Sequence, residues 1–257
     1  MTRKLIISLM FVVTIAIVAV LGCKKDIPSD AAVTKLVVAT DSTWPPMEFV
    51  NENKEIVGFD VDLIKAVGKA GGFEVEVKST AWDGIFAGLE AGEYDAVISS
   101  VTINDERKNT MDFSLPYVNA GQVIIVRSDT SGVTTLSDLS GKVVGAQIGT
   151  TGAMEIDKIP AITKKSYDEL GLAIEELVNS RIDAVVCDTP IAADFALQKA
   201  EYKNKLKIVG KAFTEEYYGI AIKKGNKRVL DAVNKGLEIV LKSDEYGKMK
   251  EKWLNIK

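Results

Sequence analysis

Segments typical of strands and helices alternate along this chain, and one such unit occurs twice. In the first copy, a helix opens at Trp82 and ends near Gly92, and an apolar strand follows at 95–98. In the second copy, a helix opens at Tyr167 and the strand follows at 181–186. Alternating strands and helices favour parallel sheets covered by helices. Two related α/β lobes would explain the repeat, and chance similarity of two ordinary units is the alternative.

Both repeated strands run directly into polar residues. Ser99 and Ser100 follow the first strand, and Asp188 follows the second. Ligands of open parallel sheets bind beyond the carboxyl ends of the strands. We therefore expect the two lobes to present these residues to one shared cleft.

The expected lobes are discontinuous in sequence. Segments 117–121 and 214–218 would cross between them as paired strands, which make a natural hinge. Lobe 1 would then comprise 35–117 with 218–257, and lobe 2 would comprise 121–214. Within lobe 1, Asp60 is expected to cap the helix that follows Gly58, and 227–253 is expected to form amphipathic helices.

The segment from Ser99 to Arg107 carries chemistry suited to a planar anion. It offers hydroxyls at Ser99, Ser100 and Thr102 and a guanidinium at Arg107. A carboxylate accepts two parallel hydrogen bonds from arginine, a geometry that lysine does not offer. The alternative is a strand end followed by a charged surface helix.

The N-terminus predicts export. Arg3 and Lys4 precede an apolar run at 5–21, so residues 1–22 read as a secretory signal. Residues 20–23 resemble the bacterial lipobox, which implies that Cys23 carries fatty acyl chains such as palmitate and that 23–34 is a lipidated tether. An uncleaved single-pass anchor is the alternative. Either reading places the protein outside the cytoplasm and attached to a membrane.

Composition excludes several classes of function. Without the two basic residues of the signal, 30 basic residues stand against 36 acidic ones, a net charge of −6 that offers no nucleic-acid footprint. The chain has no histidine, which excludes a Ser-His-Asp or Cys-His nucleophile. With Cys23 acylated, Cys187 stands alone and no intramolecular disulfide can form. We expect no metal, no cofactor and no catalytic residues.

Several motifs together resemble the bacterial family 3 solute-binding proteins, the polar amino-acid receptors of ABC importers. In the order of that family they lie at 36–41, 45–49, 58–63, 102–107, 112–114, 141–144, 148–151 and 183–188. The resemblance runs from about Lys35 to Trp253. It implies a type II periplasmic binding protein-like fold, in which two α/β lobes joined by two crossing strands enclose a ligand cleft.

The resemblance also implies how the carboxylate of an amino acid would be held. Arg107 would clamp it, assisted by Thr102 and, from the other lobe, by Thr150 and Thr151. The last two residues lie between a strand and a helix start, where free N–H groups favour anions.

The resemblance assigns the ammonium group to Asp188. The Ser99 carbonyl and the Ser100 hydroxyl would be further acceptors. In a competing interpretation, Asp188 caps the helix that begins at Thr189 and Pro190.

The ligand side chain would be sandwiched between Trp44 and Trp82, with Asp41 in the same part of the cleft. Trp82 could instead belong to the core. Indole faces attract cations, so arginine or lysine is the first choice of ligand and glutamine is the next. Gln147 also lies in this region, but its amide neither confirms nor excludes a charged ligand.

The function implied is capture of the amino acid by hinge closure, followed by delivery to an ABC permease. We expect a monomer that reaches the membrane through its lipid anchor. One alternative is an enzyme of the prephenate or arogenate dehydratase type, with Glu48 or Asp41 as the acid or base. Another is an extracellular amino-acid sensor module.

Overall fold

The computed structural model of the chain describes residues 32–255. The predicted signal at 1–22, the lipidation site at Cys23 and most of the tether lie outside the described residues. Within 32–255, no helix is long and apolar enough to cross a membrane.

Lobe 1 is built on a five-stranded sheet with the order β5-β1-β6-β15-β7. Its strands are β1 (Lys35–Thr40), β5 (Glu74–Ser79), β6 (Ala96–Val97), β7 (Met111–Phe113) and β15 (Ala221–Lys223). Its helices are α1 (Phe59–Gly71), α2 (Ile85–Ala91), α3 (Asp105–Thr110), α7 (Lys227–Leu241) and α8 (Asp244–Leu254). A small antiparallel sheet adjoins them and consists of β2 (Thr43–Trp44), β3 (Glu48–Val50) and β4 (Ile56–Val57).

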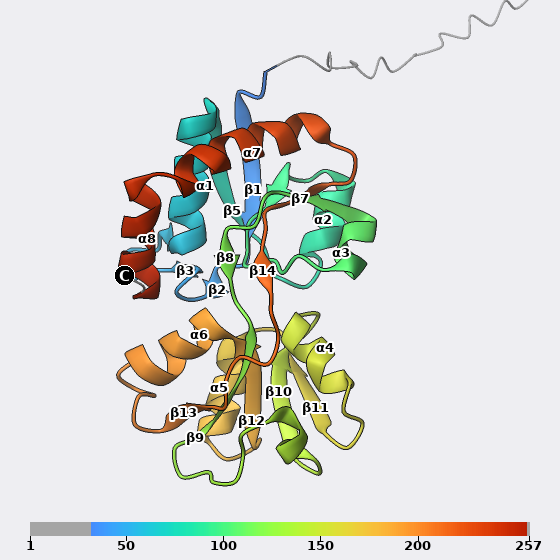
Figure 1. Cartoon of the computed structure of the whole chain (residues 1–257), viewed down its shortest axis with the longest axis vertical. Helices are drawn as coiled ribbons and strands as arrows, with labels where there is room; N and C mark the ends of the chain where they lie inside the picture. The colour runs from blue at the N-terminus through green and yellow to red at the C-terminus, as the bar shows by residue number, and fades with distance from the viewer. Residues whose placement is uncertain (1–31, 256–257) are drawn as a thin grey trace, which may run out of the picture. The chain divides into compact units, whose positions relative to one another are not determined.

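Lobe 2 repeats this plan with the strand order β11-β10-β12-β9-β13. Its strands are β9 (Gln122–Arg127), β10 (Val143–Gln147), β11 (Thr163–Tyr167), β12 (Ala184–Asp188) and β13 (Leu206–Val209). Its helical segments are η1 (Leu136–Leu139), α4 (Thr151–Asp157), α5 (Leu170–Val178), α6 (Thr189–Ala193) and the π-helical η2 (Asp194–Gln198). Figure 1 shows the two lobes one above the other.

The prediction of parallel sheets was wrong for one strand in each lobe. In lobe 2, β9 pairs antiparallel with both β12 and β13, and in lobe 1, β15 pairs antiparallel with β6 and β7. Each of these strands follows a crossing from the other lobe. It therefore enters its sheet at the edge where the parallel strands end, and it must run the opposite way.

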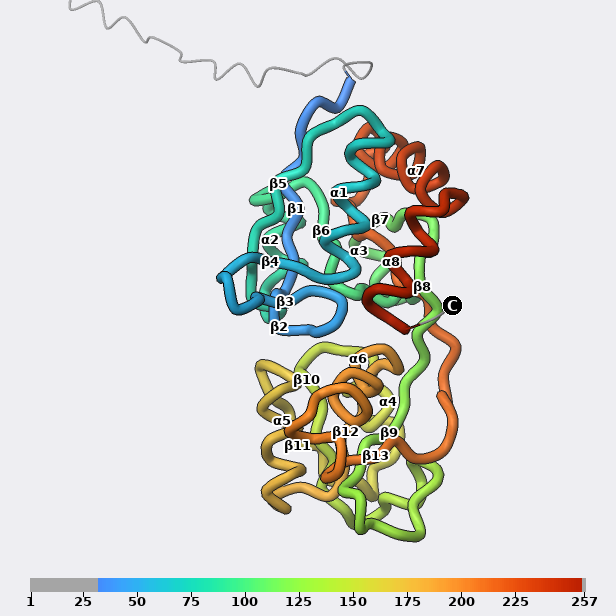
Figure 2. The backbone as a smooth tube through the Cα atoms, turned by 90° about the vertical axis from the view of Figure 1, so that its left-hand side faces the viewer, coloured from blue at the N-terminus to red at the C-terminus, as the bar shows by residue number. Residues whose placement is uncertain are grey.

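Two short strands connect the lobes along one side of the molecule (Figures 1 and 2). β8 (Val118–Asn119) leads from lobe 1 to lobe 2, and β14 (Tyr217–Tyr218) leads back. They form an antiparallel pair, with Tyr218 opposite Val118. The C-terminal helices α7 and α8 consequently pack on lobe 1 after the chain has returned.

Three predicted helix starts were misplaced, and one of them is that of α2, which was expected from Trp82 and begins at Ile85. α1 begins at Phe59 with Gly58 as its N-cap, so Asp60 lies in the first turn and does not cap the helix. Gly58 has a φ of 137°, and a Cβ there would lie 2.1 Å from the Met47 carbonyl oxygen, so only glycine fits. The helix expected from Tyr167 begins at Leu170, because Tyr167 still pairs with Gln147 as the end of β11.

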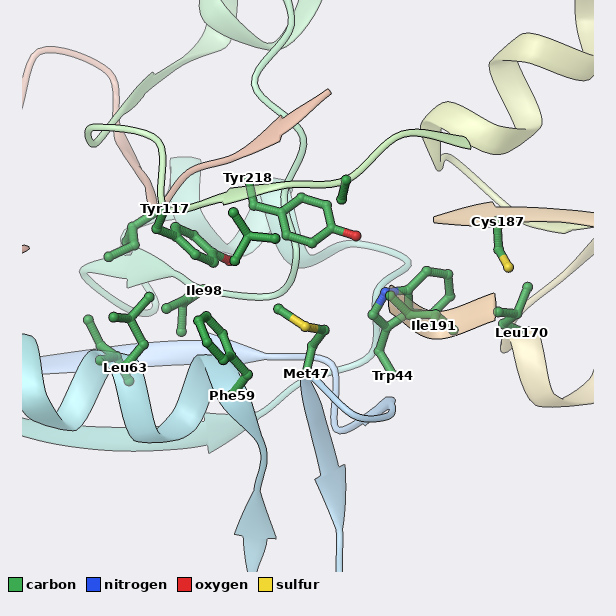
Figure 3. Packing of buried hydrophobic residues seen from close by; sticks show 14 of the residues in the cluster. Trp44, Met47, Phe59, Leu63, Ile98, Tyr117, Leu170, Cys187, Ile191 and Tyr218 are labelled. Carbon is green, nitrogen blue, oxygen red and sulfur yellow. The ribbon is translucent and has the colours of Figure 1, made fainter. Parts of the chain in front are cut away.

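A continuous cluster of buried hydrophobic residues includes side chains from both lobes. Figure 3 shows Met47 and Phe59 on the lobe 1 side and Leu170 and Ile191 on the lobe 2 side, with Trp44 between them. Trp44 is only 6% exposed. The indole is therefore fixed by packing at the level where the two lobes meet.

Candidate functional site

A cavity of about 300 Å³, counted with its opening to solvent, lies between the lobes. The structure brings all eleven predicted site residues together around it and adds Glu48 to the wall. The lining side chains are Asp41, Trp44, Glu48, Trp82, Ser99, Ser100, Thr102, Arg107, Gln147, Thr150, Thr151 and Asp188.

Strand ends place most of these side chains. Asp41 follows β1, Ser99 lies just beyond β6, Gln147 is the last residue of β10 and Asp188 is the last residue of β12. The parallel strands of each sheet end at the same edge, and these two edges face each other across the cavity. The shared cleft expected from the two polar strand ends is what the fold forms.

Arg107 is held from three directions. Its backbone N–H donates to the Asn104 side chain at the start of α3 (2.8 Å), and its guanidinium donates to the Thr102 carbonyl (3.0 Å) and the Gly149 carbonyl (3.1 Å). The ring of Trp82 lies 5.5 Å from the guanidinium carbon. Burial lowers the pKa of Arg107, and the negative charge of Asp188 opposes this shift. Arginine nevertheless stays charged. The guanidinium N–H groups that do not donate to these two carbonyls are available to an anion.

Asp188 comes from lobe 2, lines the cavity and is only 4% exposed. Its Oδ1 accepts no hydrogen bond of good geometry from the described residues, although the Tyr218 hydroxyl and the Gln122 amide lie close enough to lower the pKa of the carboxyl. Burial, and after it the negative charge of Glu216, raises the pKa of Asp188 to about 7. The residue occupies the N-cap position of α6, but its side chain makes no capping hydrogen bond. An unpaired buried acceptor is costly, so the carboxylate is suited to a cationic group that enters the cavity.

Two buried carboxyls support the serine wall of the site. The hydroxyls of Ser99 and Ser100 donate to Glu48 at 3.0 and 3.5 Å. Asp60 accepts the Ser100 N–H and the Tyr117 hydroxyl, both at 2.8 Å. Burial, followed by the charge of Asp60, raises the pKa of Glu48 well above its usual range, and burial raises the pKa of Asp60 to about 6. These contacts hold Ser100 at a φ of 50°, in the left-handed region.

At the other end of the cavity, the Gln147 amide of lobe 2 and the Asp41 carboxylate of lobe 1 form a hydrogen bond between the lobes. Gln147 donates to Asp41 (3.0 Å) and to the Asp168 carbonyl (2.8 Å), and Thr43 donates to the second oxygen of Asp41 (2.9 Å). Burial raises the pKa of Asp41. Trp82 lines this region as a partly exposed side chain and also packs on the core, so both of its predicted roles are compatible with its position.

Three threonines complete the lining. Thr150 is the N-cap of α4 and accepts the Ala153 N–H at 3.3 Å. The hydroxyls of Thr102 and Thr151 come from different lobes, lie 3.4 Å apart and both donate to Glu216.

Sequence reasoning missed Glu216 completely and considered Glu48 only as a possible catalytic acid or base. Glu48 lies within the motif at 45–49, which gave it no role in binding, and no motif marks Glu216. The only available signal for Glu216 was its place in the predicted second crossing.

A cavity enclosed between two lobes with this strand order and two connecting strands defines a type II periplasmic binding protein fold, as predicted. The model of bacterial extracellular solute-binding proteins, family 3, matches residues 36–256, and the chain belongs to this family.

Individual relatives share most of the length of this chain. The probable histidine-binding protein of Neisseria gonorrhoeae is 35% identical, over 98% of this chain and 95% of that protein. The L-cystine-binding protein TcyJ of Escherichia coli strain K12 is 32% identical, over 96% and 94%. An ancestral arginine-binding protein, solved with arginine and with glutamine, is 41% identical with a TM-score of 0.82 in both structures. The arginine complex covers 87% of this chain and 99% of its own, and the glutamine complex covers 88% and 100%.

Proposed function

We propose that this protein is the substrate-binding component of an ABC importer and captures a polar L-amino acid through its charged head group. The observation that carries the proposal is the unpaired Asp188 Oδ1 in the same cavity as Arg107. The two charges influence each other, yet no ion pair within 4.0 Å joins these two residues. A zwitterion between them would satisfy both groups.

In this proposal the α-carboxylate binds Arg107, and backbone N–H groups at Thr150 and Thr151 assist. From lobe 1, Thr102 contributes its backbone N–H, because its hydroxyl already donates to Glu216. This half of the site is supported by the buried, charged guanidinium, whose orientation is fixed by two backbone carbonyls.

The α-ammonium binds Asp188, with the Ser99 carbonyl and the Ser100 hydroxyl as further acceptors. The Ser100 hydroxyl lines the cavity, and its oxygen lone pairs can accept from the ligand.

For the ligand side chain we propose arginine or lysine first and glutamine next. Asp41, Trp44 and Trp82 supply negative charge and aromatic faces at that end of the cavity. The Gln147 amide, which already binds Asp41, suits a neutral polar group as well. The named ligands of the relatives include histidine, cystine, arginine and glutamine, and they support a polar amino acid without selecting one.

We further propose that ligand capture closes a hinge at 117–121 and 214–218, between a lobe of 35–117 with 218–257 and a lobe of 121–214. The pairing of β8 with β14 supports this division. Delivery to a permease, a monomeric state and anchoring of the exported protein through acylated Cys23 complete the proposal.

The proposed dehydratase-like activity is less well supported. It needs a general acid or base in the cavity, and Glu48 and Asp41 are the candidates. Both carboxyls are engaged by neighbouring side chains, Ser99 and Gln147, which suits a structural role in binding.

Isothermal titration calorimetry of the purified protein with each of the twenty amino acids tests the proposal. We expect heat of binding with arginine or lysine, and weaker or no heat with apolar amino acids. Binding of glutamine alone would contradict the cationic preference. If none of the twenty amino acids binds, the proposed amino-acid binding function is contradicted.

A further inference from the structure

Glu216 is a buried carboxylate on the second crossing between the lobes. Its side chain is 8% exposed, whereas the side chain of the preceding residue, Glu215, lies on the surface. A carboxylate in such a place is tolerated when hydrogen-bond donors surround it.

The donors come from both lobes and from the crossing itself. One oxygen of Glu216 accepts the Thr102 hydroxyl of lobe 1 (2.9 Å) and the Thr151 hydroxyl of lobe 2 (2.6 Å), and the Gln122 amide lies 3.4 Å from it. The other oxygen accepts the Thr214 hydroxyl (2.7 Å). Glu216 therefore joins two side chains that line the cavity from different lobes.

These bonds determine what the two threonines can offer to a ligand. A hydroxyl has a single proton to donate, and Thr102 and Thr151 both give theirs to Glu216. Toward any further group the two hydroxyls can therefore act only as acceptors, and the Thr151 oxygen already accepts the Gln122 amide at 3.1 Å. They can receive a hydrogen bond from an ammonium group, but they cannot donate one to a carboxylate.

We propose that Glu216 is a positioning residue of the binding site: it ties the lobes together through Thr102 and Thr151 and turns both hydroxyls into acceptors. The inference rests on the proposed amino-acid binding function. Because the two threonines belong to different lobes, this set of bonds exists only where the lobes have closed on each other. The bonds therefore stabilise the closed form selectively and slow the release of the ligand.

The variant Glu216→Gln tests the inference, and Glu215→Gln is its matched control. Both remove one negative charge from the same segment, but among the described residues the exposed Glu215 side chain accepts a hydrogen bond from the Tyr217 hydroxyl alone. With the amino acid that binds the wild type most tightly, we expect Glu216→Gln to weaken affinity by about 10- to 100-fold. Faster dissociation in stopped-flow tryptophan fluorescence should account for most of this loss. Glu215→Gln should stay within about twofold of the wild type.

A double-mutant cycle with Thr151→Val separates positioning from a purely structural role. If Glu216 acts through Thr151, the Glu216→Gln change costs clearly less affinity in the Thr151→Val background than in the wild type. Should Glu216→Gln fail to fold, Thr214→Val must still accelerate dissociation, because it removes the donor to the other Glu216 oxygen and Thr214 does not line the cavity.

Fully additive effects, or an unchanged dissociation rate accompanied only by a lower unfolding temperature, would overturn the inference and leave the proposed function intact. A wild-type protein that binds no amino acid would overturn both.

Discussion

Burial acts differently on the charges of the two residues that would hold the ligand head group. Arg107 keeps its positive charge, since guanidinium groups do not lose their proton in proteins. Asp188 has a pKa of about 7, so near neutral pH it is divided between its charged and neutral forms. A ligand ammonium group would favour the charged form, which couples ligand binding to release of a proton.

The first prediction concerns the planar guanidinium group of Arg107. Arg107→Lys keeps the charge but loses the planar, bidentate donor, so affinity should fall by about 1.5–3 kcal/mol in calorimetry. Arg127→Lys is the control, because Arg127 donates to the carbonyls of Leu177 and Ile182 and does not line the cavity. Equal affinity of Arg107→Lys and the wild type would refute the carboxylate assignment.

The second prediction concerns stability. Because folding raises the pKa of Asp188, ionising this carboxyl in the folded protein costs stability; the cost is absent below pH about 4 and complete above pH about 7. Asp188→Asn should therefore abolish ligand binding yet stabilise the free protein at pH 8 by on the order of 1–4 kcal/mol. Urea unfolding at pH 8 and at pH 4 measures the effect of the substitution on the free energy of unfolding where the cost is complete and where it is absent.

Asp112→Asn supplies a control of opposite sign for that experiment. The hydrogen bond from Lys224, together with one from the Gly225 N–H, lowers the pKa of Asp112. That group contributes stability above its unfolded pKa and loses it as the pH falls, so its removal should destabilise the protein at pH 8. Destabilisation by Asp188→Asn at pH 8 would contradict the account.

At the scale of elements, the first turn of α1 positions the Asp60 carboxyl, which accepts the Ser100 N–H of the site. The third prediction is that Gly58→Ala destabilises the protein by about 2 kcal/mol or more, because the new Cβ would overlap the Met47 carbonyl. Gly72→Ala, at the other end of the same helix, also has a positive φ but meets no atom within 4 Å. It should cost only about 1 kcal/mol. Equal losses in thermal unfolding would show that the close contact is not what requires glycine at 58.

Local patterns predicted many elements, and they failed where distant segments decide the outcome. The strand at 35–40 and the end of α2 at Gly92 follow from local sequence alone. Tyr167 belongs to a strand and not a helix because β10 pairs with it. Asp60 does not cap because residues far along the chain, Ser100 and Tyr117, donate to it.

Most of the cavity lining, like most of the helices and strands, was predictable from the sequence. Polar residues at strand ends and motif positions pointed to the side chains that the fold brings together. Glu216 could not be identified in this way, because an ordinary glutamate becomes a site residue only when tertiary packing buries it, and the supporting role of Glu48 beneath the serines was likewise not predicted. The lone antiparallel strand of each sheet likewise depends on the crossing of the whole chain between lobes.

At the scale of the whole molecule, three polar contacts join the lobes across the cavity. They are Gln147 with Asp41, Arg107 with the Gly149 carbonyl, and the shared bonds of Thr102 and Thr151 to Glu216. These contacts are compatible with a closed form that ligand would favour over an open one.

The fourth prediction follows from this closure. Small-angle X-ray scattering should show that the radius of gyration of the protein decreases when a saturating amount of the bound amino acid is added. A non-binding amino acid at the same concentration is the control. An identical scattering curve with and without the bound amino acid would contradict the proposed hinge.

The central claim is that Arg107 and Asp188 hold the two charges of one amino-acid head group. Calorimetry that compares the best ligand with its carboxamide and with its N-acetyl derivative tests this claim most directly, because each analogue removes one charge and keeps the side chain. The account predicts that both analogues bind at least about 100-fold more weakly than the parent amino acid. Binding of either analogue within about threefold of the parent would contradict it.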